Sequence, residues 1–164
     1  MKHILSALVL NKPGVLAHVA GMFAARAFNI DSLAVGRTDD PTLSRMTIVI
    51  IGDDKVVEQV RKQLLKIVEV VKVQDFVGQD VVARDLMLLS VACTPEKRPE
   101  ILALIEMFTG KVVDIGPKYV MVEVAGPESK IEAFIEMCRP YGIKNIVRTG
   151  TVALARQSRT KQED

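Results

Sequence analysis

The order of predicted secondary-structure elements repeats once along this chain of 164 residues. In the first half, a short apolar run ends at a turn signal, and residues at helical spacing follow it. Two alternating strands, a second helix and a last strand come next. The predicted strands are 4–10, 30–37, 45–51 and 70–77, and the helices are 15–27 and a segment that begins at Asp53 or Asp54.

The second half shows the same order, so the period is roughly 80 residues. Its predicted strands are 85–93, 111–115, 119–125 and 143–155, and its helices begin near Pro99 and Pro127. Strand, helix, strand, strand, helix, strand is the split β-α-β layout of ferredoxin-like units. We therefore predict an α+β fold of two tandem ferredoxin-like βαββαβ units. The predicted domains are residues 1–78 and 79–158, followed by a mobile tail at 159–164.

Composition excludes several classes of function. The formal charge is +2 and aromatic residues make up 4%, which argues against a partner that is a nucleic acid. No apolar run approaches the roughly 20 residues of a membrane span. The cysteines, Cys93 and Cys138, lie far apart and form no C-x-x-C pair, so we expect a reducing, cytoplasmic location.

The predicted strand 30–37 raises the question of what covers it. In a ferredoxin-like sheet the strand order is 4-1-3-2, which places this strand at an edge. It holds Ile30, Leu33, Ala34 and Val35 but no Lys or Pro, and such apolar edges tend to pair with another strand. We expect a homodimer through Ile30–Arg37; a tail or loop that caps the edge is the alternative. The sheet face away from the helices is also apolar and needs a cover, for which the other repeat is one candidate.

The turn Asn11-Lys12-Pro13-Gly14-Val15 joins the first strand to the first helix. A helix start offers unpaired N–H groups and a partial positive charge, which suit a carboxylate. Gly14 permits close approach, and the Asn11 amide offers a donor and an acceptor to a zwitterion. From the turn alone, an ordinary capped turn is the more economical interpretation.

Three motifs in register carry a family resemblance. They are Asn11-Lys12-Pro13-Gly14-Val15-Leu16, Phe28-Asn29-Ile30-Asp31-Ser32-Leu33 and the stretch from Thr38 to Thr47, and Val68–Val73 continues the match. Together they closely resemble the small, regulatory subunit of acetolactate synthase. The first half looks like the ACT domain of that family, and the likeness extends more loosely to near Ala155.

The resemblance implies a subunit that is not an enzyme by itself. Its partner would be the large catalytic subunit, which carries thiamine diphosphate, Mg and FAD and makes the precursor of branched-chain amino acids; this chain itself would bind no cofactor. The small subunit would activate that partner and confer feedback inhibition, usually by valine.

The resemblance also implies a site between the ACT domains of two chains. One chain would supply Asn11, Gly14, Val15 and Leu16, and the other Asn29 and Ile30. The carboxylate of valine would meet the N–H groups at 14–16, while Ile30, Val15 and Leu33 would enclose the isopropyl group. Plain core or interface packing remains an alternative for Ile30 and Leu33.

Departures from the family pattern limit the transfer. Ala27 stands where the family often has Gly, so we expect Phe28 or Asn29 to carry any left-handed turn. His18 stands where the family often has Arg. The second repeat has Thr94-Pro95-Glu96-Lys97-Arg98-Pro99 in place of the ligand turn, so no equivalent site is expected there.

No pattern in the chain indicates catalysis or a metal. His3 and His18 lack the spacing of metal ligands, and the pairs Asp39-Asp40 and Asp53-Asp54 fit a loop and a helix cap better than an acid–base pair. The remaining alternative function is a stand-alone ACT-type sensor of amino acids that regulates another enzyme or gene expression.

Overall fold

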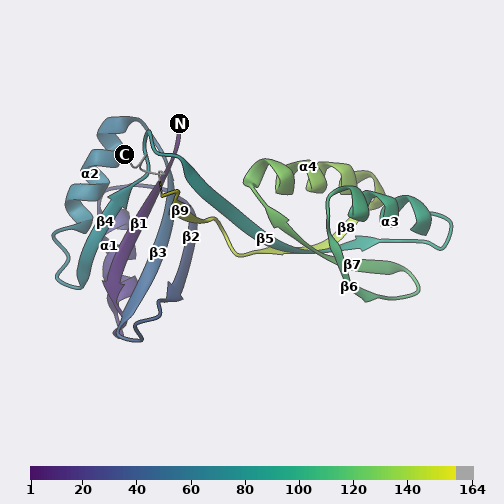
Figure 1. Ribbon diagram of the computed structural model, residues 1–164, viewed down its shortest axis with the longest axis horizontal. Coiled ribbons are helices and arrows are strands. Elements are labelled where there is room, and N and C mark those ends of the chain that lie inside the picture. Colours follow the sequence, from purple (N-terminus) through teal and green to yellow (C-terminus); the bar gives the residue numbers. More distant parts are fainter. Residues whose placement is uncertain (158–164) are drawn as a thin grey trace, which may run out of the picture. The chain divides into compact units, whose positions relative to one another are not determined.

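The computed structural model describes residues 1–157, and two compact units emerge from it. The first unit comprises Met1–Val82 and the described residues from Thr151 onward, and the second comprises Ala83–Gly150. Each unit is a sheet with two helices on one face (Figure 1). The α+β class and the paired ferredoxin-like units are therefore confirmed.

The first sheet has the order β2-β3-β1-β4, so β2 lies at an edge as predicted. The elements of this unit are β1 (Lys2–Leu10), α1 (Val15–Ala25), β2 (Ile30–Arg37), β3 (Leu43–Ile51), α2 (Asp54–Leu64) and β4 (Val70–Asp75). All neighbouring strands in this sheet run antiparallel.

The second sheet has the equivalent order β6-β7-β5-β8, and β9 pairs with β5 outside that order. Its elements are β5 (Val81–Ala92), α3 (Arg98–Met107), β6 (Lys111–Ile115), β7 (Tyr119–Gly126), α4 (Glu128–Cys138), the 3-10 turn η1 (Arg139–Tyr141), β8 (Ile143–Arg148) and β9 (Val152–Ala155).

The end of the chain differs from the prediction. The expected strand 143–155 is two strands, because Gly150 adopts a left-handed φ of 81° between β8 and β9. β5 also begins earlier than expected, at Val81, and it pairs with β9 as well as with β7 and β8. The described residues after Thr151 therefore group with the first unit, whereas we had placed them in a domain at 79–158. The predicted tail at 159–164 lies outside the described residues.

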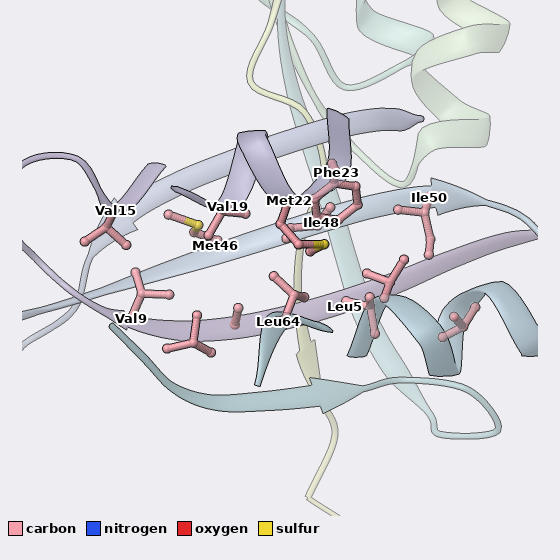
Figure 2. Close-up of a cluster of buried hydrophobic side chains, with 14 residues drawn as sticks. Leu5, Val9, Val15, Val19, Met22, Phe23, Met46, Ile48, Ile50 and Leu64 are labelled. Atoms are coloured by element: carbon pink, nitrogen blue, oxygen red, sulfur yellow. The ribbon is translucent and has the colours of Figure 1, made fainter. Parts of the chain in front are cut away.

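The core of the first unit forms between the helices and one face of the sheet. Val15, Val19, Met22 and Phe23 of α1 are buried and pack with side chains of β1, β3 and α2, among them Leu5, Met46, Ile48, Ile50 and Leu64 (Figure 2). The α1 positions recur at the 3-4 spacing that puts them on one helix face. Met46 of β3 is a core residue as well.

Candidate functional site

The start of α1 presents free backbone donors. Gly14 is its N-cap residue, with φ 86° and ψ −13°, and no side chain caps the helix. Within residues 1–157, no hydrogen-bond acceptor meets the N–H groups of Leu16 and Ala17. These donors are the groups that an anion at a helix start would use.

Among the α-helices of the described chain, α1 is the one whose first turn lacks an acidic residue. The Asp53 side chain accepts a hydrogen bond from Val56 at the start of α2, and Asp54 follows it. Glu100 and Glu128 lie in the first turns of α3 and α4. Each of those helices has a carboxylate of its own at its N-cap or in its first turn, whereas α1 has none at either position.

Asn11 is exposed, and its hydrogen-bond partners lie in the connection between β2 and β3 and not in its own turn. Its Nδ2 donates to the carbonyl oxygen of Pro41 at 3.0 Å, and its backbone N–H donates to that of Thr42 at 2.7 Å. The β2–β3 connection thus orients the amide and leaves its Oδ1 available as an acceptor. The turn sequence alone gives no sign of this partner, because Pro41 is 30 positions away along the chain.

The side chains of Val15 and Leu16 have separate environments. Val15 is 3% exposed and belongs to the core, so it offers a ligand only its backbone, whose N–H lies 3.5 Å from the carbonyl of Lys12. Leu16 is 47% exposed on the outside of α1. Of these two side chains, Leu16 is the one in a position to contact a bound molecule.

Asn29, Ile30 and Leu33 form a second group around the start of β2. Asn29 is exposed, and Ile30 and Leu33 are partly buried against the core of the first unit. The left-handed residue before them is Ala27, with φ 54°. Our expectation that Phe28 or Asn29 would adopt this conformation is therefore wrong.

Within one chain, the residues at the start of α1 (Asn11 and Gly14 to Leu16) and those around the start of β2 (Asn29, Ile30 and Leu33) do not meet. β2 runs parallel to β1, because both pair antiparallel with β3. Gly14 follows the end of β1, whereas Asn29 precedes the start of β2, and α1 spans the distance between them. An 11-residue helix is about 16 Å long, so a small amino acid cannot touch both groups in one chain.

His18 and Glu69 lie close to the start of α1. His18 Nδ1 is 3.3 Å from Glu69 Oε1, and the backbone N–H of His18 donates to the carbonyl of Gly14. A hydrogen bond from its own backbone, with a smaller contribution from His18, lowers the pKa of the Glu69 carboxyl. The side chain of His18 is 63% exposed, so it lies on the outside of α1.

The second unit has different chemistry at the corresponding helix. At the start of α3, an Arg98 nitrogen donates to the carbonyl of Gly116 at 2.9 Å, and Lys97 pairs with Glu100 at 3.2 Å. The basic side chains and the carboxylate of this turn are thus engaged with the protein itself.

The described residues offer no other evident chemistry. They contain no group of three or more His, Cys, Asp or Glu side chains that could hold a metal ion. Cys93 and Cys138 are free and buried, and burial raises the pKa of the Cys138 thiol to about 11. No helix between residues 1 and 157 has the length and apolar character to cross a membrane.

Comparison with known proteins places both halves of the chain. A family model described as an AHAS small subunit-like ACT domain matches residues 5–72, and one described as the small subunit of acetolactate synthase matches residues 84–157. A probable acetolactate synthase small subunit of Archaeoglobus fulgidus is 53% identical over 156 residues, which cover 95% of this chain and 98% of the relative. The acetolactate synthase small subunit of Bacillus subtilis is 44% identical over 162 residues, with 98% and 94% covered.

A solved structure agrees with these sequences. The crystal structure of an acetolactate synthase small subunit from Thermotoga maritima superposes with a TM-score of 0.89 at 43% identity, covering 96% of this chain and 98% of that one. The chain therefore belongs to the small-subunit family of acetolactate synthase and, as predicted, is a regulatory subunit that is not catalytic by itself.

Proposed function

We propose that this chain activates the large catalytic subunit of acetolactate synthase and confers feedback inhibition by valine or a related branched-chain amino acid. The observation that carries the proposal is the start of α1, where backbone donors lack an acceptor and no carboxylate of the chain lies in the first turn. The carboxylate of an amino acid supplies the negative charge that the other helices have built in. Thiamine diphosphate, Mg and FAD belong to the catalytic partner in this proposal, and the complex acts in the cytoplasm.

The site is completed by a second copy of the chain. Two β2 strands (Ile30–Arg37) that pair antiparallel around a two-fold axis place the start of one strand beside the end of the other. In that arrangement Asn29 and Ile30 of one chain approach the Gly14 end of its partner. The homodimer resolves the separation of the two groups within one chain.

The groups around the ligand then have distinct roles. The N–H groups of the first turn of α1 and the Asn29 amide bind the carboxylate, and Asn11 Oδ1 accepts from the ammonium group. Ile30, Leu33 and Leu16 surround the isopropyl group, whose burial contributes about 1.5–3 kcal/mol. Because one methylene changes the binding free energy by only about 1–3 kcal/mol, leucine and isoleucine compete with valine in this site.

Inhibition requires that valine binding be coupled to a change between conformational states of the complex. Valine shifts the complex only if it binds one conformational state more tightly than another, and a typical coupling free energy of about 1–3 kcal/mol suffices for strong partial inhibition.

Substitutions at Gly14 test the proposal. The space beyond its Cα is open, with no atom within 4 Å of an added Cβ, so a side chain there projects into the ligand's position. Gly14→Asp should abolish inhibition by valine, because its carboxylate occupies the place of the ligand's own, while activation persists. Gly14→Ala is the matched control: it introduces the same left-handed strain, about 1–2 kcal/mol, but no charge.

The measurement is acetolactate formation by the cognate catalytic subunit with each variant, with and without valine, alongside calorimetry of valine binding. The unsubstituted chain should raise the rate and make it sensitive to valine. Unchanged valine affinity in Gly14→Asp would refute the site, and a rate unaffected by the unsubstituted chain would refute the function.

A further inference from the structure

The chain returns from the second unit to the first through a short, well-anchored segment. The backbone N–H of Thr151 donates to Ser32 Oγ at 3.0 Å. Ser32 lies on the edge strand β2 opposite Val49, on the sheet face that points away from the helices. Val49 is 4% exposed although it is not part of the helix-side core, and Ala153 of β9 is 5% exposed. The return segment is therefore tied to β2 by a hydrogen bond to a side chain that lies on this face.

The other end of the same segment is fixed within the second unit. The backbone N–H of Thr149 donates to the carbonyl of Leu86 at 3.0 Å, and Thr149 Oγ1 accepts from the Leu86 N–H at 3.1 Å. Next to them, Arg148 Nε donates to the Asp85 carboxylate at 2.8 Å, and the Asp85 side chain is only 1% exposed. A buried carboxylate held by a guanidinium resists displacement, because separating the pair leaves a buried charge.

A single residue, Gly150, separates these two anchors. Consecutive Cα atoms are about 3.8 Å apart, so the spacer is too short to absorb a displacement in the way that a flexible linker does. Movement of Ser32 relative to β3 is therefore taken up by the Thr151 bond or by rotation about Gly150, or it is passed on to Thr149 and the strands that hold it.

We propose that the hydrogen bond between Ser32 and Thr151 transmits occupancy of the effector site on β2 to the second unit. This inference rests on the proposed function, in which Ile30 and Leu33 contact the effector. Ser32 lies between these two residues but faces the opposite side of the sheet, so it is a positioning residue and not a ligand contact. The proposal gives the second unit a role as receiver of the signal.

The test separates binding from transmission. Ser32→Ala removes the acceptor and Ser32→Thr restores a hydroxyl at the same position. Ser90→Ala is the matched control, since Ser90 is a half-buried serine on β5 within the second unit. Each full-length variant is measured by calorimetry with valine, by valine inhibition of the holoenzyme, and by hydrogen exchange at the Thr151 amide.

We expect Ser32→Ala to bind valine with an affinity within about twofold of the unsubstituted chain and still to activate the catalytic subunit. Its half-inhibitory valine concentration should rise at least about fivefold, the lower end of typical allosteric coupling. The Thr151 amide should exchange faster, and Ser32→Thr and Ser90→Ala should behave as the unsubstituted chain does.

Two outcomes overturn the inference. One is an inhibition curve for Ser32→Ala that matches the unsubstituted chain, and the other is a parallel loss of valine binding, which would make Ser32 part of the site. Absence of valine binding to the unsubstituted chain is a distinguishable result, because it overturns the proposed function and this inference with it.

Discussion

At the scale of single residues, Ala27 and Thr109 show how the repeat is built. Both adopt a left-handed conformation, with φ of 54° and 52°, directly after α1 and α3. In each case the residue's N–H and that of the next residue bond back into the last helical turn: Ala27 to Ala24 and Phe28 to Phe23, at 3.2 and 3.1 Å. This is the Schellman arrangement, and the edge-to-face contact of Phe28 with Phe23, at 6.3 Å between ring centres, supports it.

Ala27→Gly should therefore stabilise the chain. A Cβ at left-handed φ costs about 1–2 kcal/mol, and the larger entropy of the unfolded chain with glycine offsets about 0.4–1 kcal/mol of that gain, so the net gain is about 0–1.6 kcal/mol. Urea unfolding followed by circular dichroism measures it. Ala20→Gly, at an exposed position inside α1, is the control and should lose about 1 kcal/mol. Equal losses in both variants would contradict the explanation.

Sequence reasoning at this scale proposed the site residues by type, and the structure changes the role that one of them could have. The pattern placed Val15 beside the ligand, yet the same helical spacing that positions its N–H turns its side chain into the core. The Schellman bonds compensate the strain at Ala27, and a one-residue preference for glycine does not include that compensation.

At the scale of elements, the edge strands differ in whether side chains accept hydrogen bonds from their backbone N–H groups. On β6 the N–H of Ile115 donates to the Asp114 carboxylate at 2.9 Å, and on β8 the N–H of Ile146 donates to Asn145 Oδ1 at 2.9 Å. Within the described chain, no side chain caps an N–H of β2 in this way. Edge donors that are already satisfied discourage strand addition, so β2 is better prepared for it than β6 or β8.

Val35→Lys should weaken the proposed dimer. Val35 is on β2 and 47% exposed, and a lysine there replaces apolar burial by a charge that the two-fold axis duplicates. The dimer dissociation constant should rise at least about tenfold, or about 1.4 kcal/mol. Sedimentation equilibrium should show a shift toward the 18.0 kDa monomer.

Val68→Lys is the control, because Val68 is 91% exposed and lies outside the strands. A mass for Val35→Lys that remains that of the unsubstituted chain would exclude pairing at this edge.

Sequence patterns predicted the strand order of both sheets. Hydrophobic alternation located the strands, and the repeated order of strands and helices indicated the ferredoxin-like layout. They missed β9, because its pairing with β5 joins residues roughly 70 positions apart that have no shared pattern.

At the scale of the whole molecule, each unit has its own core. The buried cluster of the first unit includes Leu64, that of the second includes Phe134, and no residue belongs to both. Independent cores allow each unit to unfold as its own cooperative block, so a single unfolding free energy does not describe the chain.

Calorimetry should therefore resolve two thermal transitions. Leu64→Ala and Phe134→Ala remove side chains that are 0% exposed, and should destabilise their own units by about 2–5 and 3–5 kcal/mol respectively. Each substitution should lower one melting temperature and leave the other within a degree or two. A single transition lowered by both substitutions would show that the units melt as one.

The first unit is built from two separate stretches of the chain, with the second unit inserted between them, and this limits what a truncated chain can show. Ending the polypeptide at Val82 deletes the second unit but also removes Thr151, which bonds to Ser32, and Ala153, which belongs to the first unit as well. Loss of regulation in such a fragment would have two causes that no assay on it can separate. Removing residues 83–150 and rejoining the flanks with a short glycine-rich bridge keeps the first unit whole and deletes only its neighbour.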